Sequence, residues 1–127
     1  MRGLFIGIIV LLAIITAFSI YTYNLTSEIS QDLLSNLKQL RQVVEKEQWD
    51  EAMLKLKELD ENWDRADTWW TPLMDHRELD HLDQTIVRII GFVHQCRTGD
   101  SLIEIDAATR LVERVRARES LNVKNIF

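Results

Sequence analysis

The sequence predicts an all-α protein in which one N-terminal transmembrane helix precedes a four-helix antiparallel bundle or two stacked helical hairpins. Twenty consecutive residues, Leu4 to Tyr23, carry no charge, and a helix of that length reaches about 30 Å, the thickness of a bilayer's hydrocarbon core. In the rest of the chain, apolar residues recur every three or four positions, which is the spacing of amphipathic helices. The 127 residues include only four Gly and one Pro, so few positions interrupt a helix.

The uncharged segment has two interpretations, which differ in whether it stays in the mature protein. A cleaved secretory signal would use the basic start at Arg2 and the small residues Ala17 and Ser19. Length favours an uncleaved signal anchor, because the apolar run exceeds the usual signal-peptide core of about 7 to 15 residues. Tyr21 and Tyr23 also stand where an interfacial aromatic belt would form. We therefore expect residues 4–23 to contact membrane lipid as a single-pass anchor.

The charges beside the anchor predict its orientation. Arg2 and the amino terminus are the only positive charges before the span, whereas Glu28 and Asp32 follow it and the next basic residue is Lys38. Positively charged flanks tend to stay in the cytoplasm. The expected localisation is the cell membrane, with the N-terminus cytoplasmic and the C-terminal domain extracytoplasmic.

We divide the chain into three parts. Residues 1–26 form the anchor, residues 27–120 form one extracytoplasmic helical domain, and residues 121–127 form a C-terminal tail. A body of about 100 residues is enough for one small core and too short for two. The tail repeats apolar residues and is expected to fold back on the domain. These residues are Leu121, Val123 and Ile126 or Phe127.

The first predicted hairpin joins a helix over roughly residues 27–47 to a helix from about Asp50 to Trp69. The first helix can continue directly from the membrane helix, because only residues 24–27 offer a break. Asp50 is the expected N-cap of the second helix, and Pro72 follows its end. The predicted inner faces are Ile29, Leu33, Leu37, Leu40 and Val44, then Ala52, Met53, Leu56, Leu59, Trp63 and Ala66.

The second predicted hairpin contains two capping boxes. The stretch from Asp75 to Glu78 opens the third helix, and Gly99 is expected to close it in a left-handed conformation. The stretch from Ser101 to Glu104 opens the fourth helix, which runs to about residue 118. The predicted inner faces are Leu79, Leu82, Ile86, Ile89 and Val93, then Leu102, Ile105, Ala108, Val112 and Val115.

The two predicted hairpins resemble each other. A shift of 49 residues superposes Leu40 on Ile89 and Leu56 on Ile105. Amphipathic helices of equal length overlay in some register by default, so this match gives only modest support to an ancestral duplication.

The net charge of −5 is unevenly distributed along the chain. Residues 45–83 carry thirteen acids and five bases, a net of −8, whereas residues 84–127 carry five acids and seven bases, a net of +2. An acidic surface that faces a partner is one interpretation, and we favour the simpler one in which two oppositely charged hairpins attract each other. An acidic domain lacks the basic footprint that phosphate binding needs, which excludes nucleic acid as a partner.

Four Trp residues lie within 22 positions of one another: Trp49, Trp63, Trp69 and Trp70. Trp63 belongs to the predicted core, and Trp49 is expected to cover it at a hairpin corner. Adjacent helical residues point about 100° apart, so Trp69 and Trp70 cannot both enter one narrow stripe. Either they close the end of the bundle, or they contact a partner or the membrane surface, which makes Trp69 and Trp70 the candidate contact residues.

The third predicted helix carries potential metal ligands. His76, Asp80 and Asp83 follow the spacing i, i+4 and i+7, and His94 lies further along nearly the same line, whereas His81 points away. Two facts argue against a metal site. Acidic residues are typical of a helix N-terminus, and no zinc signature or Cys ligand accompanies them.

We expect no catalytic site and no cofactor. The chain has no Gly-rich phosphate loop and no Ser, His and acid arrangement, and its many carboxylates are those of solvated helices. Cys96 is the only cysteine, so an intrachain disulfide is excluded. It is expected to be a small buried hydrophobe, with an intermolecular disulfide as the alternative.

The chain resembles a family of short, single-pass, membrane-anchored proteins of spore-forming Gram-positive bacteria, described only as a domain of unknown function. The resemblance covers nearly the whole chain. It rests on the N-terminal anchor, the stretch from Trp49-Asp50-Glu51-Ala52 through Trp63, the stretch Leu73 to Asp80 and the ending Glu119 to Phe127. It implies a cell-surface or spore-envelope setting beside other small membrane proteins, and it assigns no functional residue.

These observations predict a non-catalytic, membrane-anchored domain that works by binding. The favoured role is an accessory or scaffold for another membrane or cell-envelope protein. The alternative is an extracytoplasmic sensor that binds a ligand or metal through the edge from His76 to Asp83.

Overall fold

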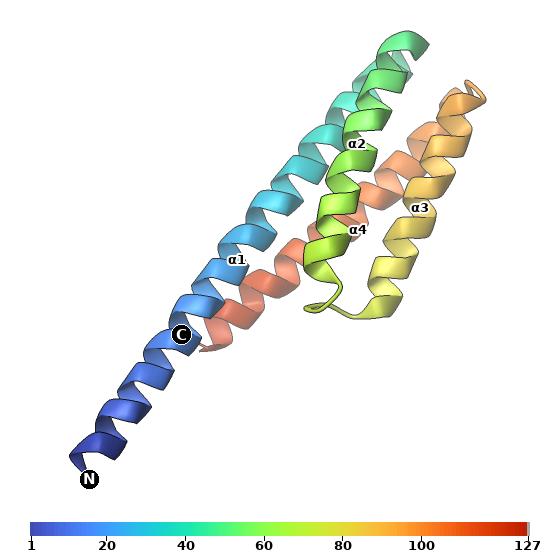
Figure 1. The fold of residues 1–127 in the computed structure, drawn as a ribbon. Helices are drawn as coiled ribbons and strands as arrows, with labels where there is room; N and C mark the ends of the chain where they lie inside the picture. Colours follow the sequence, from blue (N-terminus) through green and yellow to red (C-terminus); the bar gives the residue numbers. More distant parts are fainter. Residues whose placement is uncertain (127) are drawn as a thin grey trace.

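The protein folds into four α-helices joined by short turns. The structure, a computed structural model, describes residues 1–126, with side chains as far as Glu119. The helices are α1 (Arg2–Glu45), α2 (Trp49–Trp70), α3 (His76–His94) and α4 (Thr98–Ile126). Successive helices are antiparallel (Figure 1). Because α1 packs against both α2 and α4, and α4 also packs against α3, the arrangement is a bundle rather than a stack of separate hairpins.

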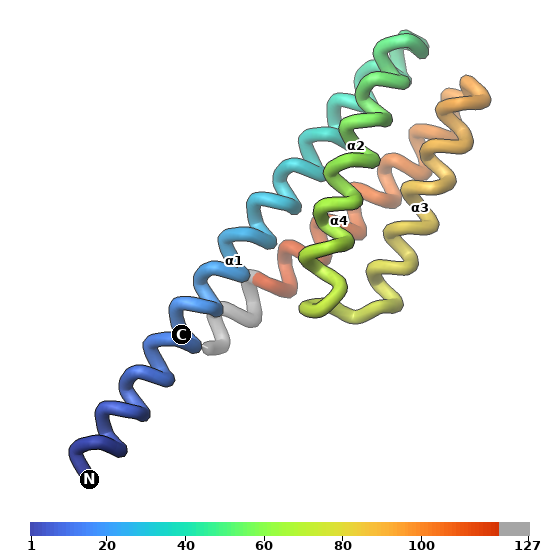
Figure 2. The backbone as a smooth tube through the Cα atoms, in the orientation of Figure 1, coloured from blue at the N-terminus to red at the C-terminus, as the bar shows by residue number. Residues whose placement is uncertain are grey.

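The predicted apolar helix and the first bundle helix are one continuous helix, α1. Residues 24–27, which offered the only break in the sequence, are helical, and the backbone passes through them without interruption (Figure 2). Hydroxyl side chains in this part of α1 are compatible with a helix because they can bond to carbonyls one turn back. Ser30 donates to the Thr26 carbonyl at 2.7 Å. The bundle is therefore joined to the apolar segment without a hinge.

Burial divides α1 into two parts. In the apolar segment no residue is buried, and this is the one helix in the described part of the chain that is long and apolar enough to cross a membrane by length and composition. From Thr26 onward one side of α1 is buried against α2 and α4. We call the end of the bundle that faces the apolar segment proximal, and the opposite end distal.

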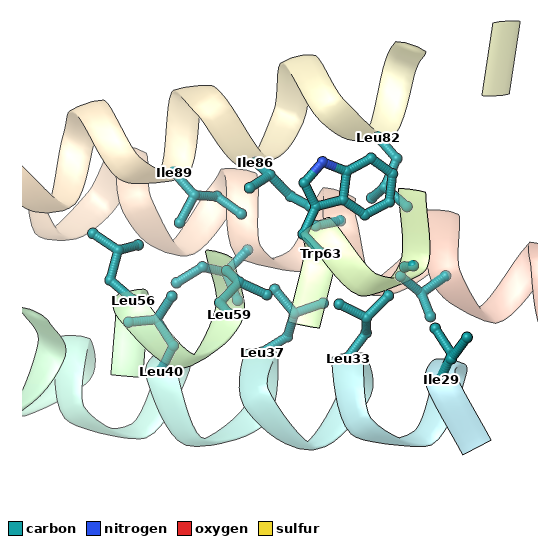
Figure 3. Close-up of a cluster of buried hydrophobic side chains, with 14 of the residues drawn as sticks. Ile29, Leu33, Leu37, Leu40, Leu56, Leu59, Trp63, Leu82, Ile86 and Ile89 are labelled. Carbon is teal, nitrogen blue, oxygen red and sulfur yellow. The ribbon is translucent and has the colours of Figure 1, made fainter. Parts of the chain in front are cut away.

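The core is a single cluster of apolar side chains from all four helices (Figure 3). It contains every residue of the predicted inner faces except two: Met53 is 38% exposed and Leu102 is half-buried. Trp70 is an additional member. The helical spacing of apolar residues is therefore confirmed as the origin of the core, since residues three and four apart lie on one helix face.

The turn between α3 and α4 differs from the prediction. Gly99 is not the left-handed residue, because it lies inside α4, and Cys96 takes that conformation instead with φ 54°. The Cys96 N–H donates to the Val93 carbonyl and the Arg97 N–H to the Phe92 carbonyl, both at 3.0 Å. These two bonds are a Schellman motif, which ends α3 at its last turn. Helix α3 therefore stops at His94.

The turn between α1 and α2 repeats this geometry 49 residues earlier. Glu47 has φ 56°, its N–H donates to the Val44 carbonyl, and the Gln48 N–H donates to the Val43 carbonyl, both at 2.9 Å. The similarity of the two hairpins thus extends to their turns. Asp50, the predicted N-cap, lies in the first turn of α2, and Gln48 takes the cap position without a side-chain hydrogen bond.

Helix α4 is longer at both ends than predicted. It begins at Thr98 and runs to Ile126, beyond the expected end near residue 118. Ser101, the predicted N-cap, is therefore inside the helix. The prediction that Leu121, Val123 and Ile126 or Phe127 fold back on the domain lies outside the side chains that the structure describes.

Ser101 is fully buried, and its hydroxyl has no hydrogen-bond partner among the described residues. Ala52 occupies the corresponding position of the first hairpin, 49 residues earlier, and is equally buried. A buried hydroxyl without a partner is destabilising, because it loses its bonds to water and gains none. The second hairpin thus carries an unfavourable polar group where the first has a methyl group.

We expect Ser101→Ala to raise the free energy of unfolding by about 1 kcal/mol, because it removes this unpaired hydroxyl. The reciprocal change, Ala52→Ser, should lower it by about 1–3 kcal/mol. Both are measured by denaturant unfolding of the full chain in mild detergent, followed by Trp fluorescence. A loss of stability in Ser101→Ala would mean that the hydroxyl has a partner in solution.

Candidate functional site

The proximal end of the bundle carries the paired Trp residues that the sequence singled out. Trp70 is fully buried in the core, whereas Trp69 is 45% exposed. Their backbones are adjacent on α2, so their side chains leave the helix in directions about 100° apart, and only one can face inward. This burial removes Trp70 from the candidate contact surface and leaves Trp69 on it.

The proximal corner, residues 71–75, connects α2 to α3. The Leu73 and Met74 N–H groups both donate to the Trp70 carbonyl at 2.9 Å, which folds the chain back immediately after α2. Asp75 is the N-cap of α3, as predicted, and its carboxylate accepts from the Arg77 N–H at 2.9 Å. Leu73 is 44% exposed at the tip of the corner. The corner therefore presents an apolar side chain to its surroundings.

Helix α4 lies beside the proximal corner. A small hollow of about 180 Å³ separates them and is bounded by Leu73, Met74 and Asp75 of the corner, Glu78 of α3, and Val115, Arg118 and Glu119 of α4. Arg118 forms an ion pair with Glu78. Burial raises the pKa of Glu119. The corner and this part of α4 thus form one surface.

Polar pairs set the register between α1 and α2. The Asn62 amide donates to the Asn36 side-chain oxygen, and Arg65, one turn closer to the corner, contacts Asp32 and Glu28 at 3.3 Å each. The contacts move back along α1 as α2 advances, as expected for antiparallel helices with equal rise per residue. The same register places Trp70, the last residue of α2, beside about residue 27 of α1, and the proximal corner follows immediately.

The candidate metal ligands on α3 are not gathered into one site among the described residues. Asp83 accepts a hydrogen bond from the Trp63 indole at 2.8 Å, which links α3 to α2. His76 and Asp80 are exposed, and His94 lies near the distal end of α3. Among the described residues, no group of three or more His, Cys, Asp or Glu side chains is arranged to hold a metal ion.

A groove between α2 and α3 was not expected from the sequence. It has a volume of about 210 Å³ and is lined by Met53, Leu56, Lys57, Asp60, Ile90 and His94. Of the four main helix–helix interfaces, that between α2 and α3 is the least extensive. Val87 of α3 is 58% exposed. Met53 was assigned to the core because it follows the helical spacing, and only the wide separation of α2 from α3 leaves it accessible.

Cys96 is exposed at the distal end, contrary to its expected burial. It lies in the Schellman turn rather than on the inner face of a helix. Nearby, the Thr98 hydroxyl donates to the Glu47 carboxylate at 3.0 Å, which joins the two distal turns. Further along the bundle, α1 is tied to α4 by Arg41, whose pKa is raised by its hydrogen bond to Asp106.

A family model described as domain of unknown function DUF4363 matches residues 20–126. The chain belongs to this family. The match includes the whole bundle and only the last residues of the apolar segment. No curated protein and no solved structure is significantly similar to the chain.

The hydrogen bond between Trp63 and Asp83 predicts that Asp83 contributes more to the stability of the fold than the neighbouring Asp80 does. We expect Asp83→Ala to lower the free energy of unfolding by about 1–2 kcal/mol, because the nearly buried indole N–H loses its acceptor. Asp80→Ala, on the same edge of α3, should change it by less than about 0.5 kcal/mol. Denaturant unfolding of the full chain in detergent measures both. Equal effects of the two substitutions would contradict a specific role for Asp83.

Proposed function

We propose that the protein is a non-catalytic accessory or scaffold, held in the cell membrane by α1. Its N-terminus lies in the cytoplasm and its bundle lies outside, where it binds another membrane or cell-envelope protein. The observation that carries the proposal is the continuity of α1, whose exposed apolar segment leads directly into the core. Exposed apolar side chains in such a run are unfavourable in water and favourable in a bilayer.

The proposed binding surface is the groove between α2 and α3. Met53 and Ile90 provide an apolar floor, and exposed Val87 extends it. Helical spacing places exposed carboxylates on the same two helix faces, from Asp60 of the groove toward the proximal end, and none of them forms an ion pair with another described residue. They are Asp60, Asp64 and Asp67 on α2, and Asp80 and Asp83 on α3.

An apolar floor with acidic walls fits a basic amphipathic helix. Such a helix lays its apolar side chains in the groove and places Lys or Arg beside the carboxylates. The interface between α2 and α3 is the least extensive of the four, and its groove of about 210 Å³ can receive a few apolar side chains of such a helix. We therefore propose that the partner contributes a cationic helix.

The proposed orientation is tested with the native cysteine. Because Cys96 is the only cysteine and is exposed at the distal end, a membrane-impermeant maleimide should label it in intact cells. Cys96→Ser is the control for labelling of other proteins. Labelling that appears only after the cells are lysed would place the bundle in the cytoplasm and overturn the orientation.

The proposed partner is tested by co-purification of the full chain from native membranes. Reversal of two groove charges, Asp60→Lys with Asp80→Lys, should reduce recovery of a partner several-fold because it repels a cationic helix. Reversal of two exposed acids outside the groove, Glu61→Lys with Glu113→Lys, should leave recovery unchanged. A variant that lacks residues 1–23 identifies proteins that co-purify independently of the anchor. Equal losses in both double variants would contradict a role for the groove.

A further inference from the structure

We propose that the proximal corner rests on the lipid headgroup layer of the membrane that α1 spans, through Leu73 at the tip and Trp69 one turn behind it. This inference rests on the proposed anchoring of α1. It assigns a lipid contact to residues that do not line the α2–α3 groove, so it concerns a second surface with a different partner.

The proximal corner lies close to the end of the apolar segment of α1. Figure 1 shows the connection between α2 and α3 at the end of the bundle that faces the N-terminus. The contacts of Asn62 and Arg65 with α1 place the end of α2 beside about residue 27, the corner follows directly, and the apolar segment ends at Tyr23. If residues 4–23 fill the hydrocarbon core, the corner lies at its boundary.

The exposed side chains of Leu73 and Trp69 are of types that favour a membrane interface. Leu73 is 44% exposed and Trp69 is 45% exposed, and both belong to types that gain by leaving water. Trp is enriched at membrane interfaces, where its ring meets apolar chains and its N–H meets polar groups. Leu73 follows Trp69 by four positions, which would be about 6 Å along a helix, and the turn after Trp70 keeps the two closer in height than that. The headgroup layer of one leaflet is about 5–7 Å thick, so it accommodates both.

The proximal corner is connected to the apolar segment through the packed bundle. Helix α1 has no break between the apolar segment and the bundle, and Arg65 ties α2 to both Glu28 and Asp32 just above the corner. On the other side, Arg118 of α4 is paired with Glu78 of α3. The corner also follows directly on Trp70, which is buried in the core, so its position along α1 is tied to that of the bundle.

Spin-label accessibility tests the proposal on the full chain in lipid nanodiscs. Leu73→Cys in a Cys96→Ser background carries one label at the corner. The native Cys96 label and Leu54→Cys in the same background, at an exposed apolar residue of α2, are matched controls. Oxygen concentrates in lipid and a nickel chelate stays in water. We expect the oxygen-to-nickel accessibility ratio at position 73 to exceed that at positions 54 and 96 several-fold.

A fourth label, Ile14→Cys in the Cys96→Ser background, reports on the anchor itself. A high ratio at position 14 together with a low one at position 73 would overturn the headgroup contact while leaving the anchoring intact. Low ratios at both positions would overturn both. Low accessibility to both reagents at position 73 would indicate a protein surface over the corner and would also overturn the lipid contact.

Trp fluorescence provides a second test that needs no label. Brominated lipids in the nanodisc should quench part of the wild-type emission, and Trp69→Phe should abolish much of that quenching. Trp49→Phe, at the distal end, is the control and should leave the quenching unchanged, because Trp49 lies near the far end of the bundle. Equal quenching in wild type and Trp69→Phe would contradict a lipid contact by Trp69.

Discussion

The structure depends on one constraint, the continuity of α1 from the apolar segment into the core. Ile29, Leu33, Leu37, Leu40 and Val44 form its buried stripe, and α2 and α4 pack against it on either side. Truncating any of these side chains leaves a cavity at the interface between α1 and the two helices that pack against it. The same helix carries the exposed apolar segment, so the orientation of that segment and the orientation of the bundle are linked.

Packing is unequal around the bundle, and this inequality leaves the groove in which we propose that a partner binds. Helix α4 is in contact with both α1 and α3, whereas α2 and α3 share the least extensive interface. The bond between Trp63 and Asp83 joins α2 and α3 where they do meet. Toward the distal end they leave the groove beside Met53 and Ile90. The proposed binding surface thus borders the core, since Leu56 belongs to the core cluster and also lines the groove.

The errors in the predicted helix ends have a common physical origin. Ser101 and Glu104 match the residue types of a capping box, and Gly99 matches those of a helix C-terminus, yet all three lie inside α4. The chain turns at Cys96 instead, because burial of Val93 and Ile105 fixes where the two helices must meet. The cost of about 1–2 kcal/mol for a residue other than Gly in the left-handed conformation is smaller than the gain from burying these two aliphatic side chains.

The sequence by itself determined the four helices, their buried stripes and the apolar segment, because helical periodicity and hydrophobicity are properties of residue order. It could not decide between Trp69 and Trp70, which are identical in type and adjacent, or place Met53 at a groove. Those outcomes depend on how far apart neighbouring helices lie, and the spacing is set by side chains from several helices at once. Tertiary structure alone also decided that the proximal corner lies beside the end of the apolar segment, since that height follows from the register between α1 and α2.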